Sequence, residues 1–243
     1  MPSILVLFTV PNRLNKNSNE ENKDNKDGEE GTVQKKITFK MLLTNKRAIV
    51  SAVSSIFAMI FMLFMDTIYS NYLISVGVPE TSIGYFFALA CLVYSIFAPL
   101  VGILCNYIAK PYLTQFAFIM SFVSLILFGP SQVLGIPQKL WIMILGNALN
   151  GFAVSFVFVP LLAEIIDAVK DKEGIEGDNE QVSDLASGMF NTSYAIGCLI
   201  APILGGLFND LYGFRYTCDI MAFSSLVLAV VYLFIILIPF VID

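Results

Sequence analysis

Apolar residues along this chain are gathered into six long runs, which short polar segments such as GVPETS and NDLYGF separate. A helix needs about 20 predominantly apolar residues to cross the hydrocarbon core of a bilayer, and each run is long enough. The pattern predicts an all-α integral membrane protein with six transmembrane helices. We expect these helices at approximately residues 48–76, 82–107, 111–129, 138–168, 184–209 and 215–241.

The composition agrees with a membrane location. Hydrophobic residues make up 57% of the 243-residue chain and charged residues 14%, whereas soluble domains are about 25% charged. The chain has no histidine, so any proton chemistry must use carboxylates. The four cysteines have no paired spacing, and nucleophile, phosphate-loop and metal-cluster motifs are missing from the sequence. We therefore expect neither an enzyme nor a cofactor.

The N-terminal part of the chain differs from the rest. Residues 1–10 form an apolar piece too short to cross a bilayer, which predicts the end of a preceding helix or a short anchor. Residues 11–39 contain six basic and six acidic residues among Asn, Gly and Ser. This composition is typical of disorder. We expect a disordered, charged cytoplasmic linker over 11–46 and the six-span bundle over 47–243.

The distribution of basic residues predicts an orientation. If the linker faces the cytoplasm, twelve of the fourteen Lys and Arg lie on that side and only Lys139 and Arg215 on the other. Cytoplasmic loops are enriched in basic residues, so both termini are expected in the cytoplasm. The sequence leaves the choice between endosomal or other vesicular membranes and the plasma membrane open.

A single acid interrupts the first span. Asp66 lies about 18 residues into it, roughly 27 Å along the helix axis. A charge at the centre of a bilayer costs at least about 2.5 to 3.5 kcal/mol, and such residues usually face the protein interior or a water-filled cavity. One interpretation is that Asp66 binds a proton or a cation. The alternative is that the span is shifted and Asp66 lies among the lipid headgroups.

Small residues in the fifth span recur at a helical spacing. They allow another helix backbone to approach closely, and the proline among them removes one backbone hydrogen bond and permits a bend. We expect this face to form a pivot against neighbouring helices. Its residues are Gly197, Ala201, Pro202, Gly205 and Gly206.

Several motifs resemble one family. GCLIAPILGG (197–206) is similar to the antiporter signature of the major facilitator superfamily, with Ala201 replacing the central Gly. GILCNYIAKP (102–111) resembles a loop signature of the same superfamily, with Asn106 where the family has Asp. The segments PLLAEIID and FMDTIYSNYL resemble the vesicular polyamine and amine transporters.

The resemblance covers the C-terminal six-helix half of a twelve-helix transporter. Such transporters move one half against the other around a midplane site. Hence this chain either belongs to a longer polypeptide, pairs with a second six-helix half or with a second copy of itself, or does not transport. Two acids of the vesicular monoamine transporters are replaced by Ser155 and Asn191, which disfavours a monoamine substrate.

The resemblance implies proton-coupled antiport of a small organic cation by alternating access, with protons, the cation and the lipid bilayer as partners and no nucleic acid. The alternative is a membrane subunit or scaffold that does not transport. Asp66 would bind the proton or the cation, and nearby polar side chains would either line the same cavity or make ordinary interhelical hydrogen bonds. The candidate binding residues are Asp66, Tyr69, Asn150, Asn191 and Tyr194.

A second candidate site lies at the expected cytoplasmic ends of the helices. Glu164 and Asp167 end the fourth span, and Asn106 and Lys110 lie in the loop between the second and third spans. These residues are expected to form a gate held by ion pairs with Lys110. The alternative is two solvated acids at a helix end.

Overall fold

The computed structural model describes residues 39–175 and 179–242, and within these ranges six helices are long and apolar enough to cross a membrane. They confirm the six predicted spans, and the all-α prediction holds for the described residues. The helices are α4 (Lys46–Ser75), α5 (Glu80–Leu104), α6 (Lys110–Phe128), α7 (Leu140–Glu173), α8 (Glu180–Tyr212) and α9 (Phe214–Tyr232), which continues through the π-helical η1 (Leu233–Leu237) into α10 (Ile238–Ile242).

The helix ends follow local chemistry. The Asn45 side chain accepts hydrogen bonds from the backbone amides of Arg47 and Ala48 and so caps α4. Gly174 ends α7 in the left-handed conformation, at a φ of 66°. A φ of 80° at Gly213 lets the chain reverse between α8 and α9.

One further short helix precedes the first span. This helix, α3 (Phe39–Thr44), lies within the range expected to be disordered. Leu42 on this helix is fully buried against the bundle, and burial of an apolar side chain provides the free energy that orders such a turn. The remaining linker residues up to 38, and residues 1–10, lie outside the described residues.

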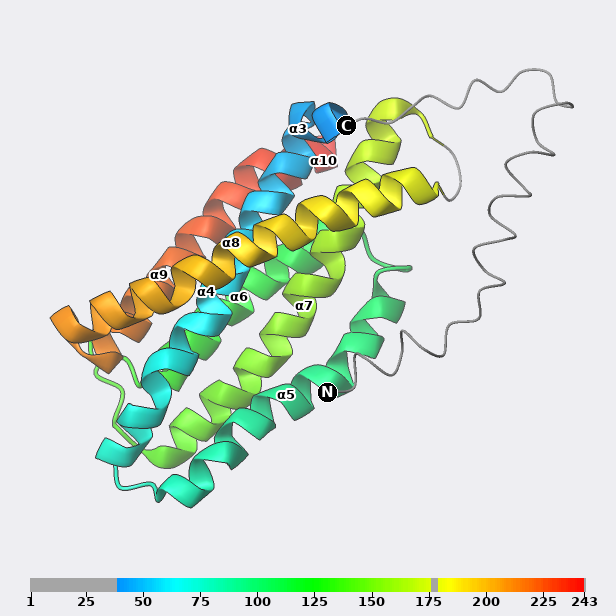
Figure 1. The fold of residues 1–243 in the computed structure, drawn as a ribbon. Helices are drawn as coiled ribbons and strands as arrows, with labels where there is room; N and C mark the ends of the chain where they lie inside the picture. Colours follow the sequence, from blue (N-terminus) through cyan, green and yellow to red (C-terminus); the bar gives the residue numbers. More distant parts are fainter. Residues whose placement is uncertain (1–38, 176–178, 243) are drawn as a thin grey trace, which may run out of the picture. The chain divides into compact units, whose positions relative to one another are not determined.

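Two helices flank the others. α5 packs on α7, and α8 packs on α4, so that α5 and α8 lie apart with α7 and α4 between them (Figure 1). Only 6% of the most apolar stretch of α5 and 17% of that of α8 is buried, against 61% for both α4 and α7. Most of the surface of α5 and α8 therefore remains available to lipid or to another protein.

The ends of the bundle differ in the number of basic residues that they carry. At one end α4, α6 and α8 begin and α5 and α7 finish, and this end carries Arg47, Lys110 and Lys172. We call it the basic end. The other end, called the opposite end, carries Lys139 and Arg215.

Candidate functional site

The half of α4 nearer the opposite end carries an exposed polar surface. Asp66, Thr67 and Asn71 are all exposed, although α4 as a whole is among the most buried helices. Ionisable side chains within membrane spans almost always face the bundle interior or a water-filled cavity, because lipid cannot solvate them. This side of α4 therefore requires either water or a protein partner beside it.

Asp66 lies nine residues before the end of α4, roughly 14 Å from it. Its side chain makes no hydrogen bond or ion pair with another described residue. A carboxylate with this freedom is able to receive a proton or a ligand cation. The structure thus places the acid within the span and not at its terminal turn.

Tyr69 lies one turn further along α4 and differs from the expectation that it faces a cavity. Its side chain is 1% exposed, and its ring packs among Phe86, Phe87, Phe128 and Phe214, with the Phe128 ring centroid 4.3 Å away. The hydroxyl is buried and has no hydrogen-bond partner among the described residues. In this conformation Tyr69 is a packing residue of the core.

The asparagines of α7 are buried. Asn147 donates from Nδ2 to the carbonyl oxygen of Phe86 and so links α7 to α5, which is the ordinary interhelical hydrogen bond. Asn150, one turn later, is 7% exposed. It lies about ten residues, roughly 15 Å, from the start of α7 at the opposite end, a depth comparable with that of Asp66.

Asn191 and Tyr194 are exposed on α8, but at a different depth. Gly205 of α8 lies against the backbone of Phe64, and the two helices run in the same direction from the basic end. Tyr194 is eleven residues before Gly205, and Asp66 is two residues after Phe64, which separates the two side chains by roughly 20 Å along the helix axes. The structure does not bring Asn191 and Tyr194 together with Asp66.

The small residues of α8 pack against α4. A Cβ atom on Gly197 would lie 2.8 Å from the carbonyl oxygen of Ile56, and one on Gly205 would lie 2.6 Å from that of Phe64. Ala201, between them, is fully buried. The predicted close approach of a second helix is therefore present. At both points where the α4 backbone contacts α8, the α8 residue is glycine, because no side chain fits there.

The other two residues of the motif lie off this contact. Pro202 is exposed, and a Cβ atom on Gly206 would meet nothing within 4 Å. α8 continues as one helix through Pro202 from Glu180 to Tyr212.

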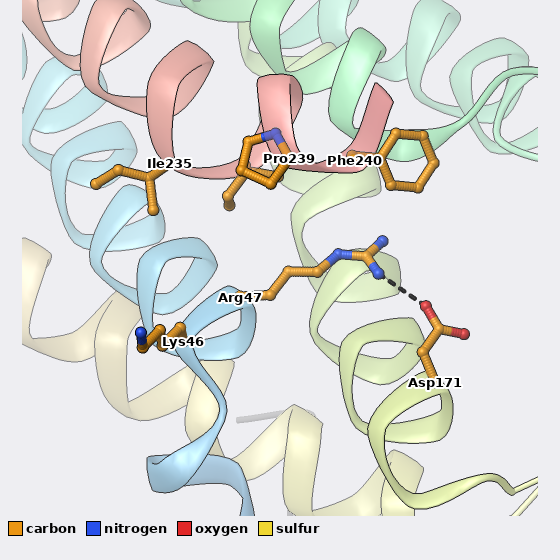
Figure 2. A pocket seen from close by; sticks show the side chains of 7 residues that line it. Lys46, Arg47, Asp171, Ile235, Pro239 and Phe240 are labelled. Carbon is orange, nitrogen blue, oxygen red and sulfur yellow. Dashed lines mark hydrogen bonds and ion pairs between the residues drawn. The ribbon is translucent and has the colours of Figure 1, made fainter. Parts of the chain in front are cut away.

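At the basic end, an ion-pair cluster joins α4 to α7. Arg47 donates from Nε to Glu164 at 2.5 Å. It also donates from Nη1 to Asp171 at 2.7 Å, as Figure 2 shows. The side chain of Glu164 is 0% exposed and that of Asp171 is 66% exposed. One carboxylate is thus held inside the bundle by a single arginine, while the other remains in contact with solvent.

A separate ion pair joins α6 to α7. Lys110 donates to Asp167, so the expected contact between Lys110 and the acids of α7 is present through Asp167. Glu164 takes a different partner, Arg47, and is not the solvated acid of the alternative interpretation. Asn106 is exposed in the loop between α5 and α6. Within the described ranges, no group of three His, Cys, Asp or Glu is arranged to hold a metal ion.

No sequence motif singles out Arg47, which lies at the boundary between the expected linker and the first span. Its partner Glu164 lies 117 residues away. The order of the spans could have indicated this pair. α4 begins and α7 finishes at the same end of a six-span bundle, which places the arginine and the acid at one membrane boundary.

Comparison with known proteins assigns a family to this arrangement. The family model of the Major Facilitator Superfamily matches residues 2–174 and 56–240. The chain belongs to the Major Facilitator Superfamily. This confirms the resemblance that the motifs indicated and agrees with the six helices observed.

Individual proteins to which this chain is similar are named as transporters. The MFS-type transporter SLC18B1 of Homo sapiens is 26% identical over 184 residues, which cover 74% of this chain and 38% of the human protein. The protein of the same name from Mus musculus is 27% identical over 146 residues, covering 59% of this chain and 31% of the mouse protein. The chain therefore spans less than two fifths of the length of these relatives.

Proposed function

We propose that this chain forms the C-terminal six-helix half of a major facilitator transporter that exchanges protons for a small organic cation, such as an amine or polyamine. The transport is by alternating access, in which two six-helix halves move against each other around a site between them. The second half comes from the same polypeptide, from another chain, or from a second copy of this one.

The observation that carries the proposal is the uncovered polar side of the bundle. Asp66, Thr67 and Asn71 are exposed on α4, and only a small part of the most apolar stretches of α5 and α8 is buried. A surface that combines a carboxylate with two largely exposed helices is poorly suited to lipid. A second half would cover α5 and α8 and enclose an aqueous cavity beside Asp66.

Within this proposal, Asp66 binds either the proton or the positive charge of the substrate. It makes no ion pair with another described residue, so no resident cation competes with a ligand. Asn150 lies at a depth in the bundle comparable with that of Asp66. Asn191 and Tyr194 lie nearer the basic end and would contact the ligand at a different point of its path from Asp66. The α4 to α8 contact at Gly197, Ala201 and Gly205 forms the pivot of this movement, with Pro202 and Gly206 lying off the contact.

We further propose that the basic end faces the cytoplasm and acts as a gate. The Lys110 to Asp167 pair and the Arg47 to Glu164 pair both join α7 to a neighbouring helix there. Breaking ion pairs at one membrane boundary while the other boundary closes is a two-state change of the kind that alternating access needs. Asn106 lies in the same loop region as Lys110 and would border this gate.

The experiment that tests the proposal is uptake of a labelled polyamine into proteoliposomes driven by an imposed pH gradient. Asp66→Asn is expected to abolish uptake, because the amide binds neither a proton nor a cation at this position. Asp66→Glu keeps the carboxylate and should retain part of the activity. Asp210→Asn, at an exposed acid near the end of α8, serves as the matched control. Equal uptake by Asp66→Asn and the unmodified protein would refute the role of Asp66.

The second candidate is a membrane subunit that does not transport. The distance of roughly 20 Å between Asp66 and Tyr194 along the helix axes favours it, since one small cation does not contact both. Such a subunit should co-purify in a fixed ratio with another membrane protein bound over α5 and α8, with no uptake. Crosslinking from an exposed residue such as Leu199 on α8 would identify that protein.

A further inference from the structure

A cavity of about 730 Å³ lies at the basic end, between the start of α4 and the end of the sixth span (Figure 2). It combines charged and apolar side chains. Its lining residues are Lys46, Arg47, Asp171, Ile235, Ile236, Pro239 and Phe240.

The charged side of this cavity favours an anion. Lys46 is exposed and makes no ion pair with another described residue. Arg47 uses Nε and Nη1 for Glu164 and Asp171, and its Nη2 makes no hydrogen bond within the described residues. Arg47 already faces the carboxylates of Glu164 and Asp171, so Lys46 is the cation of the lining that is available to an anionic group.

An apolar groove of about 480 Å³ continues along the same seam. On α4, Lys46 is followed at helical spacings of seven and four residues by Val53 and Phe57, which line the groove. On the sixth span, Val227 and Val231 of the groove precede Ile235 of the cavity at steps of four. Positions at these spacings share one helix face, so the charged cavity and the apolar groove are consecutive along one seam.

The length of the seam matches one leaflet. Phe57 lies eleven residues after Lys46, roughly 16 Å along α4. Half of the hydrocarbon core of a bilayer is about 15 Å thick. A molecule with a charged head in the cavity and a chain in the groove therefore needs the dimensions of a membrane phospholipid.

The backbone of the sixth span changes at the junction. η1 (Leu233–Leu237) is a π-helical segment and contributes Ile235 and Ile236 to the cavity. π-helical turns inside longer helices occur frequently at functional sites. Here the segment lies where the groove joins the cavity, between the apolar face of α9 and Pro239 of α10.

We propose that this seam binds one anionic glycerophospholipid from the leaflet at the basic end. Its phosphate lies between Lys46 and Arg47, and one acyl chain fills the groove between α4 and α9. Basic pockets between transmembrane helices on the cytoplasmic side are suited to anionic lipid headgroups. The site is separate from Asp66 and does not depend on transport activity.

The headgroup contact is tested by thermal unfolding and native mass spectrometry in nanodiscs of phosphatidylcholine with and without phosphatidylserine. The unmodified protein should unfold at a higher temperature with phosphatidylserine and retain one such lipid. Lys46→Gln should weaken phosphatidylserine binding about fivefold, which corresponds to about 1 kcal/mol for one basic residue. Lys139→Gln at the opposite end is the matched control and should behave as the unmodified protein. Equal binding by Lys46→Gln, or no preference for phosphatidylserine, would overturn the proposal.

The acyl-chain contact has its own test. Val227→Trp fills the groove, whereas Val230→Trp changes an exposed valine of the same helix that does not line it. Only Val227→Trp should lose the retained lipid. Soluble glycerophosphoserine, which has the headgroup without chains, should not raise the unfolding temperature. Equal retention by both variants, or full protection by the soluble headgroup, would exclude a lipid bound along the seam.

Discussion

Arg47 and Glu164 form an ion pair of 2.5 Å between the first turn of α4 and the part of α7 near the basic end, and the carboxylate is completely buried. One oxygen of Glu164, Oε2, has no hydrogen-bond partner among the described residues. Removing one partner of a buried pair leaves an uncompensated charge and costs far more than removing an exposed one.

Arg47→Met is therefore expected to destabilise the protein by about 3 kcal/mol, measured as thermal or denaturant unfolding in detergent. Adding Glu164→Gln to this variant should restore most of the loss, because the buried charge is then gone. Asp171→Asn removes the exposed partner of the same arginine and should cost no more than about 1 kcal/mol. Equal losses in Arg47→Met and Asp171→Asn would show that the buried pair does not dominate.

Adjacent glycines of α8 provide a second prediction. Gly205→Ala places a methyl group 2.6 Å from the carbonyl oxygen of Phe64, so α8 must move away from α4 at a cost of about 1 to 3 kcal/mol. Gly206→Ala meets nothing within 4 Å and should be neutral or stabilise the helix by up to about 1 kcal/mol. The unfolding temperatures of the two variants measure the difference. A similar loss in both would contradict the close packing of α8 on α4.

A third prediction concerns the loop between α6 and α7. Arg215 donates to the carbonyl oxygens of Pro130 at 2.6 Å and Ile136 at 2.9 Å, and the buried Asp219 accepts from the backbone amides of Gln132 and Val133. Hydrogen bonds to charged groups contribute about 1.5 to 3 kcal/mol each. Arg215→Ala should increase hydrogen exchange across this loop at least tenfold.

The control for this loop is Lys139→Ala, at an exposed residue whose side chain makes no hydrogen bond with the described residues. It should leave exchange in the loop unchanged. Unchanged exchange in Arg215→Ala would mean that the loop is ordered by its apolar contacts alone.

The Lys110 to Asp167 pair is tested through Cys105, which lies just beyond the end of α5. Burial raises the pKa of the Cys105 thiol, the Lys110 ammonium lowers it and the Asp167 carboxylate raises it. Only the thiolate reacts with maleimide, so the labelling rate rises with pH through this pKa. Lys110→Gln should shift the profile to higher pH and slow labelling at neutral pH. Asp167→Asn should shift it to lower pH and accelerate labelling.

These rates are measured in a variant whose other three cysteines, Cys91, Cys198 and Cys218, are replaced by alanine. The double variant Lys110→Gln with Asp167→Asn should return the profile close to its starting position. Shifts in the same direction for both single variants would indicate a change of accessibility and not of charge.

Local patterns in the sequence are sufficient to predict the six spans and the small-residue face of α8. A long apolar run crosses a bilayer only as a helix, because lipid cannot satisfy an unpaired backbone, and the spacing of Gly197, Ala201 and Gly205 places them on one face of that helix. Both features depend on residues close together in the chain. The family motifs are local in the same way, which is why they could be recognised without the structure.

Contacts between residues that are distant in the sequence depend on how the helices pack. Periodicity along a helix does not specify its neighbour or its rotation. Glu164 therefore pairs with Arg47 and not with Lys110, and Tyr69 lies inside an aromatic core although its position suggested a cavity. The depth of Asp66 relative to Tyr194 likewise follows from the register of α4 on α8, which is set where glycine allows the two backbones to touch.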